Sequence, residues 1–119
     1  MILLAEDDEL LAALLRHRLE KAGYEVFLSS DGKEVKDFLE KRIPDIIICD
    51  IMMPYFSGME VTDHIRNVLK SDVPIIIISS ADNEDNVINT FELGANDFLS
   101  KPLSPSELLI RVAKELNTK

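Results

Sequence analysis

Five short runs of apolar and β-branched residues recur along the chain, and a stretch with helical spacing follows each of them. The runs cover residues 2–5, 24–28, 45–49, 74–79 and 97–99. Four of them are solidly apolar or β-branched, as expected for parallel strands that helices cover on both faces. Strands that alternate with helices in one short chain predict a doubly wound α/β fold, with a five-stranded parallel sheet and five helices.

The helical stretches carry apolar residues three and four positions apart. We expect Gly23 and Gly94 to close the first and fourth helices, and the turn at residues 30–32 to begin the second. The expected buried faces, in chain order, are Leu10, Leu11, Leu14, Leu15 and Leu19; Val35, Phe38 and Leu39; Val61, Ile65, Val68 and Leu69; Val87, Ile88, Phe91 and Leu93; and Leu108, Leu109, Val112 and Leu116.

Length and charge narrow the range of functions. A chain of 119 residues has the size of one domain, which we take to span residues 1–119. A net charge of −9 argues against direct binding to nucleic acid or to an anionic membrane. No apolar run is long enough to cross a bilayer. The single cysteine forms no intrachain disulfide or zinc cluster, which is consistent with a cytoplasmic protein.

Polar side chains follow the predicted strands at one edge of the sheet. In a doubly wound sheet, ligands bind beyond the carboxyl ends of the strands. Glu6 and Asp7 follow the first strand, Asp50 the third, Ser79 the fourth and Lys101 the fifth. We therefore expect three carboxylates, a hydroxyl and an ammonium group to lie close together.

This combination of groups indicates phosphoryl chemistry. Crowded carboxylates repel one another, and Mg²⁺ relieves the repulsion while keeping sites open for phosphate oxygens. Lys101 and Ser79 would contact the remaining phosphoryl oxygens. A carboxylate nucleophile at Asp50 would become an acyl phosphate.

Several other polar or reactive residues are better explained by a structural role than by a role in phosphoryl chemistry. Asp8 and Glu9 are best explained as the acidic first turn of a helix. Cys49 is expected in the core, and His17 and His64 are expected at the surface. Taken singly, the other site residues could also be strand-end caps or loop residues.

Five segments together resemble response regulator receiver domains over essentially the whole chain. They are residues 2–8, 45–54, 57–60, 74–79 and 94–102, in the order and spacing of that family. The resemblance implies a flavodoxin-like sheet with strand order 2-1-3-4-5. It also implies a signalling role in a two-component phosphorelay rather than an enzyme with its own substrate.

The resemblance assigns roles at the acidic edge. It implies that Asp50 is the phosphoacceptor and that Mg²⁺, or Mn²⁺, is the cofactor. The implied metal ligands are Glu6 through water, Asp7 and Asp50 directly, and the backbone carbonyl of Met52. Lys101 would contact the phosphoryl group, and its bond to Pro102 would be cis.

A switch is also implied. Ser79 takes the position of the switch hydroxyl and Phe98 that of the aromatic rotamer switch. The chain departs from the common pattern at three places: Ser79 replaces a threonine, Ser80 replaces a small alanine, and Phe98 replaces a tyrosine.

Residues 101–112 are similar to the subfamily with winged-helix DNA-binding output domains, whose members regulate transcription. Those receivers pair through helix four, strand five and helix five. Asp97 and Arg111 match positions of inter-subunit ion pairs on that face. Glu107 belongs to the same face, but Asn86 stands where its arginine partner is typical. The implied partners are a sensor histidine kinase, a second copy on phosphorylation, and an output domain or effector protein.

The resemblance also implies that Met52 and Ala81 occupy the positions best placed to hold the water that hydrolyses the acyl phosphate. Neither side chain can orient water by hydrogen bonding, so we predict slow self-dephosphorylation.

Three other functions compete with this interpretation. A magnesium-dependent phosphate hydrolase would need a cap insertion, for which the chain has no room. A flavodoxin-type flavin carrier would need a loop rich in Ser, Thr and Gly after the first strand, where this chain is acidic. A receiver-like domain that acts without phosphorylation would not need Glu6, Asp7, Asp50 and Lys101 together.

Overall fold

The computed structural model describes residues 1–80 and 84–117, which form a parallel sheet with the strand order β2-β1-β3-β4-β5. The predicted fold class and strand order are confirmed, with strand ends within two residues of those expected. Every neighbouring pair of strands is parallel. The strands are β1 (Ile2–Ala5), β2 (Val26–Ser29), β3 (Ile46–Asp50), β4 (Ile75–Ser79) and β5 (Asp97–Ser100).

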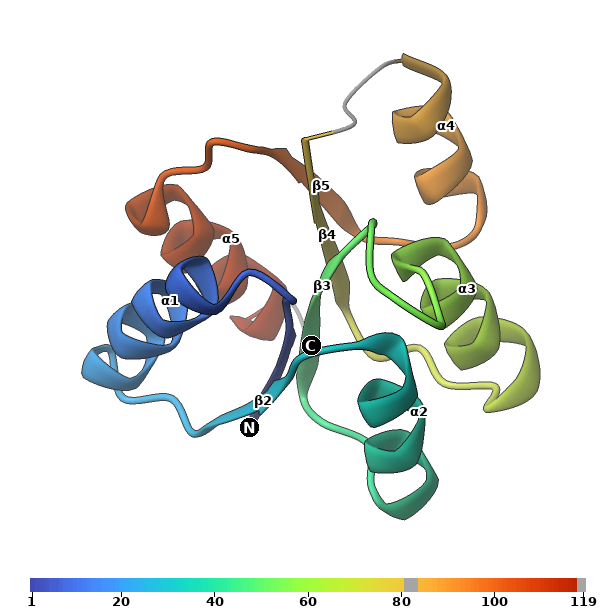
Figure 1. Cartoon of the computed structure of the whole chain (residues 1–119), viewed down its shortest axis with the longest axis horizontal. Coiled ribbons are helices and arrows are strands. Elements are labelled where there is room, and N and C mark those ends of the chain that lie inside the picture. Colours follow the sequence, from blue (N-terminus) through green and yellow to red (C-terminus); the bar gives the residue numbers. More distant parts are fainter. Residues whose placement is uncertain (81–83, 118–119) are drawn as a thin grey trace.

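Helices cover both faces of the sheet. In Figure 1, α1 and α5 lie on one side of the sheet, and α2, α3 and α4 lie on the other. This is the arrangement that solidly apolar strands require, because both of their faces must be shielded from water. The helices are α1 (Glu9–Lys21), α2 (Gly32–Lys41), α3 (Gly58–Asp63), the π-helical turn η1 (His64–Val68), α4 (Glu84–Glu92) and α5 (Pro105–Asn117).

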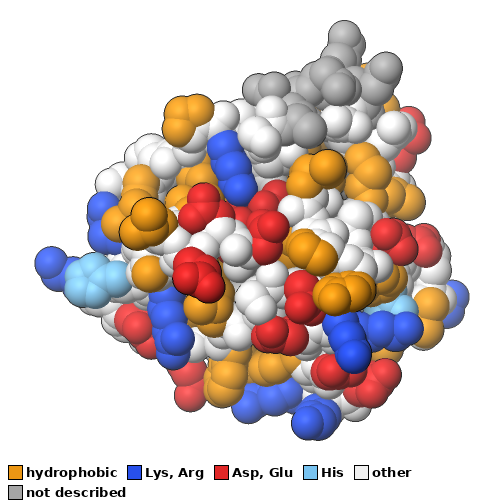
Figure 2. All heavy atoms as spheres, viewed as in Figure 1, with side chains coloured by type: hydrophobic (Ala, Val, Ile, Leu, Met, Phe, Trp, Pro, Cys, Tyr) orange, Lys and Arg blue, Asp and Glu red, His pale blue; other side chains and the backbone are white. Residues whose placement is uncertain are grey.

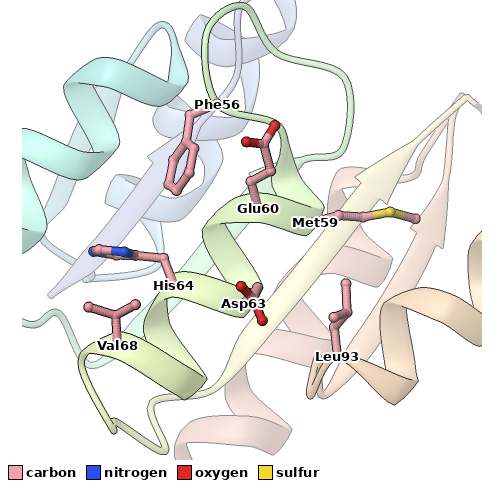
Figure 3. Close-up of a pocket in the computed structure, with 7 residues that line it drawn as sticks. All are labelled: Phe56, Met59, Glu60, Asp63, His64, Val68 and Leu93. Atoms are coloured by element: carbon pink, nitrogen blue, oxygen red, sulfur yellow. The ribbon is translucent and has the colours of Figure 1, made fainter.

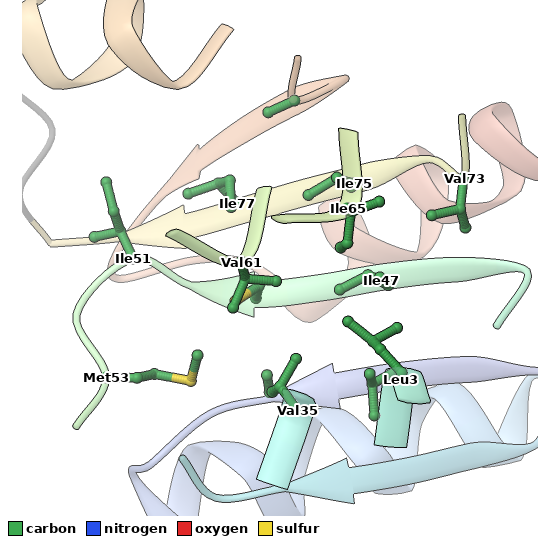
Figure 4. Packing of buried hydrophobic residues seen from close by; sticks show 14 residues of the cluster. Leu3, Val35, Ile47, Ile51, Met53, Val61, Ile65, Val73, Ile75 and Ile77 are labelled. Carbon is green, nitrogen blue, oxygen red and sulfur yellow. The ribbon is translucent and has the colours of Figure 1, made fainter. Parts of the chain in front are cut away.

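Alternate residues of the central strands point into two separate cores. Leu3, Ile47 and Ile77 pack with Val35 of α2 and Val61 of α3, as Figure 4 shows. The intervening strand residues pack on the other face with α1 and α5; they include Ile2, Leu4, Ile46, Ile48, Ile76 and Ile78, together with Leu15, Leu19, Leu108 and Val112. Nearly complete burial of these strands fixes their register.

The helix ends follow the expected local chemistry. The side chain of Asp8 caps α1 by accepting bonds from the backbone N–H groups of Leu10 and Leu11. Asp31 caps α2 by accepting from Glu34. Gly23, just after α1, has φ +100°, a conformation that glycine adopts at little cost.

The predicted buried face of α1 is partly wrong. Leu15 and Leu19 are buried, but Leu10 is 85% exposed and Leu14 is 49% exposed. The true buried stripe runs through Ala12, Leu15 and Leu19, three and four residues apart. At 100° per residue, positions 10 and 14 lie almost opposite this stripe, and a leucine-rich segment leaves the choice of face open.

Two other predicted faces also need correction. Val68 is 64% exposed, because the chain forms the wider π-helical turn η1 and the stripe of α3 is not continued in register. Ile88 and Phe91 of α4 are 45% and 44% exposed, whereas Thr90 in the same helix is buried. Its hydroxyl donates to the backbone oxygen of Asn86, so the polar group is satisfied inside the helix.

None of the helices in the described part of the chain is both long and apolar enough to cross a bilayer. The peptide bond between Lys101 and Pro102 is cis, as predicted.

Candidate functional site

Three acidic side chains meet where β1 and β3 end. These strands are neighbours, with Ala5 opposite Cys49, so Glu6 and Asp7 emerge beside Asp50. One carboxylate oxygen from each of the three acids lies within 4.8 Å of the others. Figure 2 shows acidic side chains grouped on this face, with a basic side chain beside them.

Lys101 joins the cluster from the loop after β5. Its Nζ lies 3.0 Å from Oδ2 of Asp50 and 2.8 Å from Oε1 of Glu6. The backbone N–H of Lys101 also donates to the carbonyl of Ser79, at 2.7 Å. The ends of β1, β3, β4 and β5 are thereby linked around one centre.

Burial sets the electrostatics of Glu6. Glu6 is 1% exposed and Asp50 4% exposed, whereas Asp7 lies in solvent. Burial of Glu6, with Asp50 nearby, raises the pKa of its carboxyl group to about 7, although Lys101 acts in the opposite direction. Burial would lower the pKa of Lys101, but the two carboxylates outweigh it and raise that pKa.

Backbone groups fix the orientation of the two buried carboxylates. The N–H of Met52 donates to Oδ1 of Asp50 at 3.1 Å, and the N–H of Asp8 donates to Oε2 of Glu6 at 3.0 Å. The other oxygen of Glu6, Oε1, is buried and lies 2.8 Å from the ammonium group of Lys101.

This arrangement fits a hard divalent cation. Mg²⁺ prefers carboxylate oxygens and retains water molecules, and Asp7 lies at the open side of the cluster where water has access. A cation here would also offset the repulsion among three carboxylates, of which Glu6 and Asp50 are buried.

The two predicted switch residues lie next to this edge. Ser79 is the last residue of β4 and is fully buried. Phe98 of β5 is partly buried and packs on the core that β3 shares with α2 and α3. Ser79 is paired with Ser100, and Phe98 with Ile77, in the register of β4 and β5.

The three residues of the predicted dimer face form a network within the chain. Nη1 of Arg111 contacts both carboxylate oxygens of Asp97, and its Nη2 donates to Oε1 of Glu107 at 3.2 Å. Asp97 above all raises the pKa of the Arg111 guanidinium. Glu107 therefore has a basic partner one helical turn away in α5.

A separate hollow of about 320 Å³ lies on the outer side of α3. Figure 3 shows Phe56, His64 and Val68 on one side of it and Met59 and Leu93 on the other. It shares no residue with the acidic cluster, so it belongs to a different part of the surface.

The residues expected outside the site behave mostly as predicted. Cys49 is buried, and burial raises the pKa of its thiol, so it is part of the core. His17 is exposed. His64 is at the surface but half-buried, because its ring packs edge-on against Phe56 with centroids 5.8 Å apart. Ala81 lies outside the described residues.

Sequence reasoning missed two contributions to the site. The sequence predicts Asp8 only as part of the acidic start of a helix, whereas its side chain caps α1 and its backbone N–H orients Glu6. Gly32 was interpreted only as part of a turn, yet it packs directly on the loop that follows Asp50. A glycine at the first position of a helix, where a cap residue already precedes it, was the signal available.

Comparisons with known proteins agree with this geometry. The family model described as "Response regulator receiver domain" matches residues 2–113. The alkaline phosphatase synthesis transcriptional regulatory protein PhoP of Bacillus subtilis (strain 168) is 39% identical over 111 residues, which cover 93% of this chain and 46% of that protein. The chain thus spans about half the length of this curated relative.

Solved structures give the same result. The receiver domain of the Francisella response regulator 1452 is 34% identical, with a TM-score of 0.92, and the match covers 99% of this chain and 98% of that one. The signal receiver domain of a histidine kinase from Syntrophus aciditrophicus is 31% identical, with a TM-score of 0.88, covering 98% and 89%.

Proposed function

Because the chain belongs to the family of response regulator receiver domains, we propose that Asp50 accepts a phosphoryl group from a sensor histidine kinase. The chain is a receiver domain of two-component signalling. The observation that supports Asp50 most directly is its position: one of its carboxylate oxygens lies within 4.8 Å of an oxygen of each of the two other acids, and Nζ of Lys101 is 3.0 Å away.

Mg²⁺, or Mn²⁺ in its place, would be held by Asp7 and Asp50 directly, by Glu6 through water, and by the backbone carbonyl of Met52. When bound, the cation neutralises negative charge that develops on the transferred group. The cluster of three carboxylates, of which Glu6 and Asp50 are buried, supports this assignment.

The chain's own residues then carry out the transfer. An oxygen of Asp50 forms a bond to phosphorus while the bond from phosphorus to the donor's histidine nitrogen breaks, and that nitrogen keeps the electron pair. Lys101, now paired with Asp50 and Glu6, would move its ammonium group onto a phosphoryl oxygen. Ser79 would donate its hydroxyl to another oxygen.

The surface around the cluster suits a protein donor. Leu10, Met52 and Tyr55 are 85%, 66% and 82% exposed, and they neighbour the acidic residues in the sequence. We infer that these exposed apolar side chains provide a contact area for a partner. We place this encounter in the cytoplasm.

Phosphorylation would then act on the output face. The added charge draws Ser79 and Lys101 toward Asp50, and Phe98 turns into the space that Ser79 leaves. The face of α4, β5 and α5, with Asp97, Arg111 and Glu107, would control a homodimer and an output domain or effector protein. Residues 1–119 would form one receiver unit that also assists its own dephosphorylation.

The test is phosphorylation by a small phosphodonor. Incubation with acetyl phosphate and Mg²⁺ should add one phosphoryl group, measured by intact mass. Asp50→Asn should remain unmodified, and the control Asp37→Asn, an exposed acid on α2, should be labelled like the wild type. Full labelling of Asp50→Asn would disprove the assignment.

A further inference from the structure

The loop at residues 51–57 connects Asp50 to α3 and carries the backbone carbonyl proposed as a metal ligand. Its first part is joined to the site, because the N–H of Met52 donates to Oδ1 of Asp50 at 3.1 Å. Its end is held by the N–H of Gly58, which donates to the carbonyl of Ile51 at 3.0 Å. A shift of the middle of this loop would therefore change the position of Met52 relative to Asp50.

Gly32, the first residue of α2, contacts the middle of the loop. Its N–H donates to the carbonyl of Pro54 at 3.1 Å. A Cβ atom at position 32 would overlap both the carbonyl oxygen and the Cβ of Phe56. In Figure 1 the loop between β3 and α3 descends toward the start of α2. Because the overlap involves backbone, a side-chain rotation could not relieve it.

Phe56 has little freedom to retreat. Its N–H donates to the carbonyl of Pro54 at 2.8 Å, and its ring packs edge-on against His64. The ammonium group of Lys36 lies 5.7 Å from the centre of the same ring. Tyr55 already has φ +71°, which is strained for a residue with a side chain. A side chain at position 32 would therefore push the loop as a unit.

We propose that Gly32, outside the acidic cluster, is a positioning residue for the metal site. Because Gly32 has no side chain, α2 can hold the β3–α3 loop in the position where the N–H of Met52 donates to Asp50 and its carbonyl can bind the cation. This inference rests on the proposed function for its metal ligand, and on observed contacts for the loop itself.

The first test compares Gly32→Ala with a matched control, Gly23→Ala. Gly23 also loses stability when substituted, because its φ is +100°, but no atom lies within 4 Å of a Cβ there and it sits at the far end of α1. Calorimetric titration with Mg²⁺ alone should show binding weakened by about tenfold or more in Gly32→Ala. Gly23→Ala should bind like the wild type despite its lower unfolding free energy.

Wild-type Mg²⁺ affinity in a folded Gly32→Ala would overturn the proposal, and so would equal weakening in both variants. If Mg²⁺ does not bind to the wild type at all, the proposed function fails. Hydrogen exchange of the Met52 amide in metal-free protein then decides the inference: faster exchange in Gly32→Ala supports it, and unchanged exchange overturns it.

A second test uses the wild type and so does not depend on folding of a variant. Coupling between two sites is reciprocal, so Mg²⁺ should slow hydrogen exchange at the amide of Gly32, although this residue supplies no ligand. The amide of Arg42, bonded to the carbonyl of Phe38 at the other end of α2, is the control and should not change. If Mg²⁺ does not change hydrogen exchange at Gly32, the metal site and Gly32 are not coupled.

Discussion

Arg111 and Asp97 form an ion pair inside one chain, with Nη1 of Arg111 2.7 Å from Oδ1 and 2.6 Å from Oδ2 of Asp97. The family resemblance implies that the same two residues pair between subunits of a phosphorylated dimer. Both arrangements use the same charges, so an inter-subunit pair would replace the intrachain pair. Replacing an intrachain ion pair by an inter-subunit one would add little to the affinity of the dimer. Its effect would be specificity, because it determines which surfaces of the two subunits pair.

Mixed single variants can separate the two arrangements. Arg111→Glu alone and Asp97→Lys alone each place like charges together, so neither should dimerise well with a phosphoryl mimic bound. In a mixture, opposite charges face each other only between different subunits. We therefore expect the mixture to recover the dimer in sedimentation velocity.

Lys33→Glu, an exposed charge reversal on α2, is the control and should dimerise like the wild type. Monomers in the mixture, under conditions in which the wild type dimerises, would remove Asp97 and Arg111 from the interface. A wild type that stays monomeric with the mimic bound would contradict the dimer itself.

Proton binding at Glu6 should compete with Mg²⁺. The pKa of Glu6 is raised from 4.5 to about 7 by burial and by Asp50, so the folded protein binds this proton more tightly than the unfolded chain does. Proton binding at Glu6 therefore stabilises the folded protein, and this stabilisation is fully present below about pH 4.5 and is lost as pH rises through about 7. The unfolding free energy of the metal-free protein should therefore fall across this window.

Metal binding requires the ionised carboxylate, so Mg²⁺ affinity should weaken by up to about tenfold for each pH unit below 7. Calorimetry at several pH values measures this dependence. Glu6→Gln should flatten the pH dependence of the unfolding free energy, whereas Glu9→Gln, an exposed acid in the first turn of α1, should leave it in place. A wild-type affinity that is constant from pH 5.5 to 8 would contradict the prediction.

Asp8 should matter for stability rather than for the metal ion. Its Oδ1 accepts from the N–H groups of Leu10 and Leu11 at 3.1 and 3.2 Å. Asp8→Ala should lower the unfolding free energy by about 1 kcal/mol, and Asp8→Asn, which can still cap, by much less. Urea denaturation measures both. A strong loss of Mg²⁺ affinity in Asp8→Asn would instead make Asp8 part of the metal site.

The fold was predictable because its determinants are local and repeated. The apolar runs could only become buried strands, and the acids at their ends had to meet once the order of the sheet was fixed. Helix faces were less certain, because Leu10 and Leu14 fit a stripe as well as Leu15 and Leu19 do. Packing against the sheet determines which of these two faces is buried, and the spacing of the leucines does not distinguish between them.

Contacts between distant backbone segments were beyond the reach of sequence patterns. Arg66 in η1 donates to the carbonyl oxygens of Gly94 and Ser71 and to Oδ1 of Asn96. This network ties the π-helical turn to the start of β5, and no motif announced it. The approach of Gly32 to Phe56 is of the same kind, since it depends on where two loops meet in space.

The lifetime of the phosphoryl group should depend on the side chain of Met52. Hydrolysis needs a water held in line with the phosphorus–oxygen bond, opposite the oxygen of Asp50. Met52 is 66% exposed next to Asp50 and carries no polar side-chain group that could hold this water firmly. Met52→Asn combined with Ala81→Glu should therefore shorten the lifetime several-fold, where each factor of ten corresponds to about 1.4 kcal/mol in the barrier.

Loss of phosphate, followed by intact mass after removal of the donor, measures the rate. Val68→Asn is the matched control, because it makes a similarly exposed apolar residue (64% against 66% for Met52) polar in η1, outside the acidic cluster. Equal lifetimes in the double variant and the wild type would mean that Met52 and Ala81 do not control the water, and that motion elsewhere in the loops sets the rate.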